Sequence, residues 1–248
     1  MISQARAAGG WASSRTVSAA VSTELLRRKM TRCKWFTLKC AIFCLAFAAV
    51  AISAAHPQAN LIPNPGFTDA KNPLLGWRTD FPTEAWYVKN VEYVKPANMN
   101  GKPCIVIELP PGIAGNQGGK IESALVKAEP GATYRVEIDC MTWDFSAKLH
   151  AEAWTHDPKP DQKRNIFRIP AAEDHPALFM CYRAQFPDPP ANSKKWSTAS
   201  REFTVPETVT VAGEEQKPEF ISLKAVVYAA TPNGGKSFFT NFRLIRVK

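Results

Sequence analysis

The sequence predicts an all-β protein, a β-sandwich jelly roll in a single domain. Three observations favour this class. No stretch keeps the 3.6-residue apolar period of an amphipathic helix. Many short segments alternate apolar and polar residues instead, and turns rich in Pro and Gly separate them. The chain holds 20 prolines, which interrupt helices and mark turns. Short strands divided by such turns are typical of sandwiches and jelly rolls.

The clearest strand pattern runs from Glu129 to Thr155. Pro130-Gly131 indicates a turn, and Phe145-Ser146-Ala147 a tight connection between two strands. Side chains in a strand alternate between its two faces, so the apolar set on each strand must face the core. These sets are Tyr134, Val136, Ile138 and Cys140, then Leu149, Ala151 and Ala153. We therefore expect two neighbouring strands that share one buried face and one polar face.

The remaining strands follow the same signals of alternation, β-branched content and flanking turns. They are expected at Trp86–Val88, Val91–Val94, Pro103–Leu109, Ile121–Lys127, Glu202–Val205, Thr208–Val211, Phe220–Ala230 and Phe238–Val247. Asn60–Phe67 suits an edge strand or an extension before one, because it contains Pro63 and Pro65. Ala177–Phe186 fits either a strand or a short helix.

The N-terminus has the composition of a secretion signal over residues 30–55. Basic residues in Thr31–Lys39 precede an uncharged apolar run, Cys40–Ala55, which ends on the small residues Ser53-Ala54-Ala55. The run is shorter than the roughly 20 residues of a spanning helix, which favours cleavage and export without stable membrane insertion. A retained anchor is the alternative. Residues 1–29 are interpreted as a non-native extension upstream of a start at Met30, or as a disordered extension.

The positive charge of the chain is concentrated in this N-terminal part. Eight of the 31 basic residues and one of the 22 acidic residues precede residue 56. The rest carries 23 basic and 21 acidic residues, a net charge of +2, which gives no support for nucleic-acid binding. Outside the signal the chain has three cysteines, Cys104, Cys140 and Cys181. They allow one disulfide in an exported protein, or three buried thiols, and no pair has metal-ligand spacing.

The order of several short motifs resembles a known family. Asn60–Phe67 (NLIPNPGF) is followed by Leu75-Gly76-Trp77, and Val126–Tyr134 (VKAEPGATY) by Trp196 and Phe203–Pro206. The chain ends on Phe238–Val247 (FFTNFRLIRV). Together these motifs are similar to carbohydrate-binding modules of families 4, 9 and 22, with a galactose-binding-like jelly roll. The resemblance covers residues 60–248 and implies a domain that binds glycan, often beside a glycoside hydrolase.

Two positions depart from that family pattern. Relatives usually carry acids where this chain has Thr68 and Thr240, and those acids help to hold a structural calcium ion. Calcium requires several oxygen ligands, preferably carboxylates. The missing acids put the ion in doubt, although Asp69 offers a partial substitute, so no metal site and no cofactor are predicted.

The polar face of the two long strands is the predicted ligand site. Aromatic rings stack on the apolar faces of sugars, and charged groups pair with their hydroxyls. The residues expected to bind a polysaccharide or glycoconjugate there are Arg135, Asp139, Trp143, His150, Glu152 and Trp154, joined by Tyr228 from a later strand. In the alternative interpretation, residues 157–195 cover both tryptophans, which then form a second small core.

The N-terminal signal predicts an exported protein, in the periplasm, at the cell surface or in the medium, and the resemblance implies a domain without catalytic activity. One alternative is a cell-surface jelly roll with a structural or protein-interaction role. A minor alternative is a glycoside hydrolase. Glu137 and Asp139 resemble part of the E-x-D-x-(x)-E motif of family 16 hydrolases. Met141 and Thr142 occupy the possible places of its third acid, and Glu152 is the remaining candidate partner.

Overall fold

The computed structural model describes residues 59–81, 84, 87, 89–112, 118–160, 168–190, 192–229 and 233–248, without the side chains of residues 145, 146, 228 and 229. The predicted signal, residues 30–55, and the extension before it lie outside these residues. Pro57–Lys248 forms one compact unit. No helix of the described residues is long and apolar enough to span a membrane.

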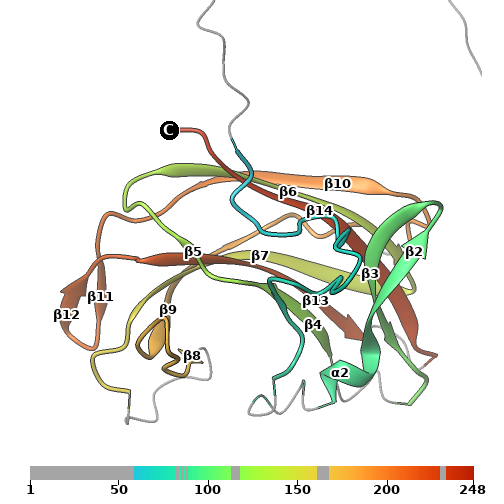
Figure 1. Cartoon of the computed structure of the whole chain (residues 1–248), viewed down its shortest axis with the longest axis horizontal. Helices are drawn as coiled ribbons and strands as arrows, with labels where there is room; N and C mark the ends of the chain where they lie inside the picture. Colours follow the sequence, from blue (N-terminus) through green and yellow to red (C-terminus); the bar gives the residue numbers. More distant parts are fainter. Residues whose placement is uncertain are drawn as a thin grey trace, which may run out of the picture. The chain divides into compact units, whose positions relative to one another are not determined.

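Two antiparallel sheets face each other across a common core (Figure 1). One has the order β1-β4-β13-β7-β9-β8, with β5 also pairing with β13, and the other has the order β10-β6-β14-β3-β2. The strands of the first sheet are β1 (Trp77–Arg78), β4 (Gly119–Ser123), β5 (Val126–Lys127), β7 (Phe145–His156), β8 (Arg168–Ile169), β9 (Leu178–Gln185) and β13 (Phe220–Ala229). Those of the second are β2 (Val94–Met99), β3 (Lys102–Leu109), β6 (Thr133–Trp143), β10 (Ser197–Thr204) and β14 (Gly235–Arg246). Strands β11 (Val209–Val211) and β12 (Glu214–Gln216) form a separate hairpin. This is the predicted β-sandwich jelly roll.

The apolar residues of the two long strands lie where alternation places them. Tyr134, Val136, Ile138 and Cys140 on β6 and Leu149, Ala151 and Ala153 on β7 are at most 2% exposed and belong to one core cluster. They reach that core from opposite sides, because β6 belongs to the five-stranded sheet and β7 to the seven-stranded sheet. The expectation that these strands neighbour each other is therefore wrong.

The connection between β6 and β7 is shorter than predicted and crosses between the sheets. Phe145-Ser146-Ala147 already belongs to β7, and Asp144, with φ +59°, is the residue between the strands. Asp tolerates this left-handed conformation better than most residues. The chain thus leaves one sheet and enters the other without pairing back on itself.

Two other elements differ from their predictions. Asn90–Tyr93 forms the short helix α2 in place of the strand predicted at Val91–Val94. The buried Asn90 anchors it, since its amide donates to the carbonyls of Thr79 and Lys120 and its Oδ1 accepts from the backbone N–H of Lys120. The segment Ile121–Lys127 divides into β4 and β5, because Ala124 donates its N–H to Gly76 at 2.7 Å and leaves the ladder.

The three cysteines of the described residues, Cys104, Cys140 and Cys181, are free thiols on β3, β6 and β9. The disulfide alternative is therefore not realised in this structure. Burial raises the pKa of Cys140 to about 11 and that of Cys181 to about 12. Thiols that remain protonated are poor nucleophiles and poor metal ligands.

Candidate functional site: the concave face of the seven-stranded sheet

The residues predicted to form one ligand site lie on two opposite faces of the sandwich. Arg135, Asp139 and Trp143 point outward from β6, whereas His150, Glu152 and Trp154 point outward from β7. Since β6 and β7 belong to different sheets, the six side chains cannot line one surface, and that part of the prediction is wrong. Tyr228 lies on β13 opposite Ser146 of β7; its side chain is outside the described residues.

The outer face of the seven-stranded sheet is concave. Its two edge strands are β1 and β8, yet residues beside both line a single pocket of about 440 Å³. Arg78 and Glu122 come from the β1–β4 edge, and Ile169 and His175 from β8 and the segment after it. In Figure 1, strands β8 and β9 of this sheet lie below β7 at one end, and α2 lies below β13 and β4 at the other. This pocket and the adjoining polar face of β4, β13 and β7 are called the groove below.

Trp154 supports the groove from beneath rather than lining it. It is 2% exposed and packs with Leu178 and Phe220, flanked by Ile169 and Met180. Three of its five neighbours in this cluster, Leu178, Ile169 and Met180, come from the segment 157–195. For Trp154, the alternative interpretation of a second small core is therefore confirmed.

Glu152 anchors one ion-pair cluster in the floor of the groove. Its carboxylate is fully buried and meets Lys224 of β13 at 2.5 Å and Arg183 of β9 at 2.7 Å. These residues extend from three adjacent strands, because β7 lies between β13 and β9. A buried carboxylate needs such compensation, since desolvation of an unpaired charge costs several kcal/mol.

Glu122 anchors a second cluster two strands away. It pairs with Arg78 at 2.8 Å and lies 3.9 Å from Lys120, which also pairs with Glu84 at 2.8 Å. Burial by itself would raise the pKa of Glu122. The charges of Lys224, Arg78 and Lys120 outweigh it and hold the pKa below its usual value. Glu122 is therefore an ionised acceptor at neutral pH.

Hydrogen bonds link Trp154 to this second cluster. The indole Nε1 of Trp154 donates to Ser222 Oγ at 2.9 Å, and Ser222 Oγ donates to Glu122 Oε1 at 3.1 Å. All three side chains are buried. The tryptophan predicted to stack on a ligand thus helps to position a carboxylate instead.

His150 is held as a neutral imidazole beside the Glu152 cluster. It is 6% exposed, and its Nδ1 has no hydrogen-bond partner among the described residues. Burial and then the cations Arg183, Lys224 and Lys148 lower its pKa to about 4, against the opposing effect of Asp188. An imidazole in this state offers a hydrogen-bond acceptor and a donor, and no charge.

Several groove residues were not among the predicted site residues, namely Arg78, Lys120, Glu122, Arg183 and His175. Lys120 and Glu122 alternate with the buried Ile121, and Lys224 alternates with Leu223 and Ala225. In the sequence, charged residues at every second position of a strand could therefore have indicated a polar outer face there. That signal shows that the residues share a face of their own strand, but only the strand order shows that β4 and β13 are neighbours.

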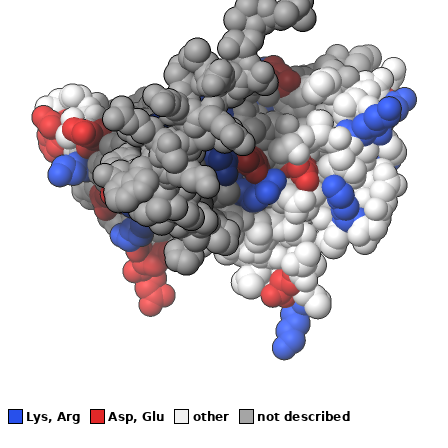
Figure 2. Space-filling model, turned by 90° about the horizontal axis from the view of Figure 1, so that it is seen from above, with Lys and Arg blue, Asp and Glu red and all other residues white. Residues whose placement is uncertain are grey.

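Arg135 and Asp139 lie among charges on the five-stranded sheet. Seen from that side, acidic and basic side chains lie beside one another (Figure 2). Glu137 pairs with Arg135 at 3.2 Å and with Arg243 at 2.8 Å. Asp139 accepts hydrogen bonds from Thr198 at 2.6 Å and Asn241 at 2.8 Å. Glu152 lies in the other sheet, so it cannot complete a catalytic pair with these acids.

Trp143 remains partly exposed at one end of that same face. Its ring packs edge-to-face on Phe238 at 5.6 Å between centroids, and Lys236 Nζ lies 4.5 Å from its centroid. Neighbouring apolar side chains are Cys104, Met141, Val106 and Trp196. The core that contains Trp143 is thus separate from the one that contains Trp154.

The positions compared with a calcium site are occupied by protein hydrogen bonds. Asn64 Oδ1 accepts from the backbone N–H groups of Thr68 and Asp69, and Thr240 donates to the Pro103 carbonyl at 2.8 Å. Within the part of the chain that the structure describes, no three His, Cys, Asp or Glu residues are placed to hold a metal ion.

Comparison with known proteins identifies similar folds among solved structures only. No protein-family model and no curated protein sequence matches the chain. Similar structures include the enzymatically active domain of bacteriophage CBA120 tailspike protein 4, with 10% identity, a TM-score of 0.43 and 76% of this chain covered. The chain spans only 21% of that protein.

The solved structures similar to this chain are mostly carbohydrate-binding modules. TmCBM61, solved with β-1,4-galactotriose, is 16% identical with a TM-score of 0.39; the match covers 76% of this chain and 99% of that one. The CBM22-1–GH10 modules of Clostridium thermocellum Xyn10B, solved with xylohexaose, are 11% identical with a TM-score of 0.44, covering 79% and 29%. A CBM4 structure and the CBM22-1–CBM22-2 tandem domain of Paenibacillus barcinonensis Xyn10C are also among these structures.

Proposed function

We propose that this chain is an exported, non-catalytic protein that binds a polysaccharide or glycoconjugate in the groove. The observation that carries the proposal is the lining of the 440 Å³ pocket. Arg78, Glu122 and His175 offer charged and polar groups, while Leu125 and Ile169 offer apolar surface. A sugar presents both hydroxyls and apolar C–H faces, so it matches a concave site with this mixture.

The fixed charges of the groove favour binding of hydroxyl groups. The side chain of Arg78 is 38% exposed, and a guanidinium donates several hydrogen bonds in a rigid plane. Because Arg78 and Glu122 hold each other at 2.8 Å, neither needs to be ordered when a ligand arrives. Such preorganisation lowers the entropic cost of binding.

The state of Glu122 supports binding rather than hydrolysis. Glycoside hydrolases need one carboxylic acid whose raised pKa keeps it protonated as the general acid. The pKa of Glu122 is lowered instead, through Lys224, Arg78 and Lys120 acting against burial. Glu152, in the floor of the same groove, is engaged by both Lys224 and Arg183.

Affinity electrophoresis through gels that contain soluble xylan, mixed-linkage β-glucan or β-1,4-galactan tests the proposal. We expect retardation by at least one polymer, and a loss of about tenfold in affinity in Arg78→Ala and in His175→Ala, because each removes a hydrogen-bond donor to the ligand. Arg246→Ala is the matched control. Arg246 is also a half-exposed arginine in an ion pair, with Glu129 at 2.6 Å, away from the groove.

Folding of each variant is checked by its thermal unfolding before the gels are compared. Passage of the wild-type chain through every polymer without retardation contradicts the proposal and favours a structural or protein-interaction role. Retardation that both groove variants preserve places the sugar elsewhere on the molecule. Release of reducing sugar from any of the polymers supports the hydrolase instead.

A further inference from the structure

A row of outward side chains crosses the five-stranded sheet on the face opposite the groove. Lys236 of β14 is the register partner of Trp143 on β6 and of Glu108 on β3. Beyond Glu108, the hollow that it lines also contains Tyr93 of α2. The four residues Trp143, Lys236, Glu108 and Tyr93 are called the transverse row.

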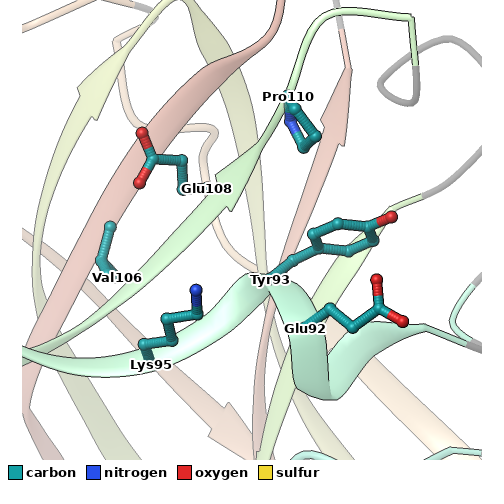
Figure 3. A pocket seen from close by; sticks show the side chains of 6 residues that line it. All are labelled: Glu92, Tyr93, Lys95, Val106, Glu108 and Pro110. Atoms are coloured by element: carbon teal, nitrogen blue, oxygen red, sulfur yellow. The ribbon is translucent and has the colours of Figure 1, made fainter.

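The far end of the row is a small hollow of about 280 Å³ (Figure 3). Figure 3 shows the Tyr93 ring between Pro110 and Glu92, with Glu108 and Lys95 across the hollow. Tyr93 is 8% exposed, and its hydroxyl forms no hydrogen bond with another described residue. A hollow of this size is near the lower limit for small-molecule sites, so it fits a single sugar ring.

The charged residues of the row and its hollow are free to meet a ligand. Glu92, Lys95 and Glu108 are exposed, and none of them forms an ion pair with a described residue. This differs from the other half of the same face, where Glu137 and Asp139 are fully engaged by Arg135, Arg243, Thr198 and Asn241. Carboxylates and an ammonium group without protein partners are suited to the hydroxyls of a neutral ligand.

Aromatic and apolar surface accompanies these charges along the row. Trp143 forms one end of the row, and Lys236 Nζ lies 4.5 Å from the centroid of its indole ring. Beside the row, Met141, Phe238 and Val106 form a second line of outward side chains on the same three strands. Three strand spacings separate the two ends, a span of about 14 Å. The row therefore has the length of a short oligosaccharide segment and the mixture of groups that such a segment needs.

We propose that the transverse row is a second carbohydrate-binding site, which takes an uncharged oligosaccharide lying across β6, β14 and β3 with one ring in the hollow at Tyr93. The equal presence of Lys and Glu along the row favours a neutral glycan over an acidic or basic one. The site does not depend on the groove, because the two lie on outer faces of different sheets. A sugar polymer that fits both sites is cross-linked by the protein.

Fluorine NMR of the full chain labelled with 5-fluorotryptophan tests the second site locally. The chain has seven tryptophans, and loss of one resonance in Trp143→Phe assigns that of Trp143. The probes are pentasaccharides of β-1,4-linked glucose, xylose, galactose and N-acetylglucosamine. We expect a saturable shift of the Trp143 resonance with at least one of them, and affinity about tenfold weaker in Glu108→Gln and in Lys236→Ala.

Two controls on the same face match the variants. Lys102→Ala removes a lysine that lies over another indole, that of Trp196, at 5.3 Å. Glu202→Gln changes an exposed carboxylate on β10. Both are expected to leave the titration unchanged, as is the groove variant His175→Ala. The second site therefore stands if the groove fails, and the groove stands if this site fails.

Three outcomes overturn the proposal. No pentasaccharide shifts the Trp143 resonance, or the shift persists with unchanged affinity in both Glu108→Gln and Lys236→Ala. In the third, the resonance shifts with protein concentration and not with sugar, which assigns the face to association between copies of the chain.

Discussion

The titration of His150 makes the stability of the folded chain depend on pH. Its imidazole is buried beside Lys224 and Arg183, so protonation would add a cation where two are already present. Burial and these cations therefore lower its pKa to about 4, whereas an unfolded histidine titrates near 6.5. The folded state thus binds fewer protons than the unfolded state between these values. Stability is fully present above pH 6.5 and falls as the pH decreases towards 4.

We expect the free energy of unfolding to fall by about 2 kcal/mol between pH 6.5 and pH 5 through His150 alone, at about 1.4 kcal/mol per pH unit. Urea denaturation at several pH values measures this slope. In His150→Gln the slope is expected to flatten, because the amide does not titrate. His156→Gln, which changes an exposed histidine at the end of β7, serves as the control. An unchanged slope in His150→Gln contradicts the assignment.

At the scale of secondary structure, ion pairs as well as backbone hydrogen bonds hold β7 to its neighbours β13 and β9. Glu152 on β7 contacts Lys224 on β13 and Arg183 on β9. The same sheet carries Glu122 on β4, whose partners lie on β1 and β4. These clusters lie on the outer face, and the inward residues of the same strands are Ala, Leu, Ile and Val. The sheet thus separates an apolar core from a charged groove floor.

Removing the charge of Glu152 is expected to be costly. Glu152→Gln leaves Lys224 and Arg183 without their shared carboxylate, so we expect a loss of about 3–5 kcal/mol in unfolding free energy. Glu137→Gln is the control on the other sheet. Its partners Arg135 and Arg243 have side chains 42% and 45% exposed, and such pairs contribute about 1 kcal/mol or less. Equal losses in urea denaturation would contradict a special role for the groove cluster.

For the whole domain, Gly119 lies so close to the opposite sheet that no side chain fits there. A Cβ atom placed there would lie 2.1 Å from Ile107 Cγ2, and Gly119 is on β4 whereas Ile107 is on β3. The glycine thus allows the seven-stranded and the five-stranded sheets to approach where their core side chains are large. A larger residue must push the sheets apart or displace Ile107.

We expect Gly119→Ala to lower the unfolding free energy by about 1–3 kcal/mol through overpacking. In an Ile107→Ala background the same change should cost less, because the clashing methyl group is gone. A double-mutant cycle by denaturant unfolding measures this coupling. Gly66→Ala is the control, since its Cβ would meet only Asn241 Oδ1 at 3.5 Å and Thr68 Cγ2 at 3.6 Å. Additive effects would show that the sheets do not touch there.

The candidate site could be predicted only in part. His150 and Glu152 are correctly placed outward on one strand, and Trp143 on another, because each residue's direction follows from strand alternation. Trp154 has the same outward direction, yet Leu178 and Phe220 bury it. These come from segments distant in sequence, so alternation within one strand contains no information about them.

The sequence by itself determines the fold class and the inward or outward direction of nearly every core residue, since both depend on local periodicity and turn chemistry. Only the tertiary structure decides which sheet each strand joins. The backbone N–H and C=O groups that pair strands are the same in every residue, so the side-chain pattern of β6 and β7 does not name their partners. The assignment of strands to sheets separates Trp143 from Trp154. It also brings Arg78, Glu122 and Lys224 together in the groove.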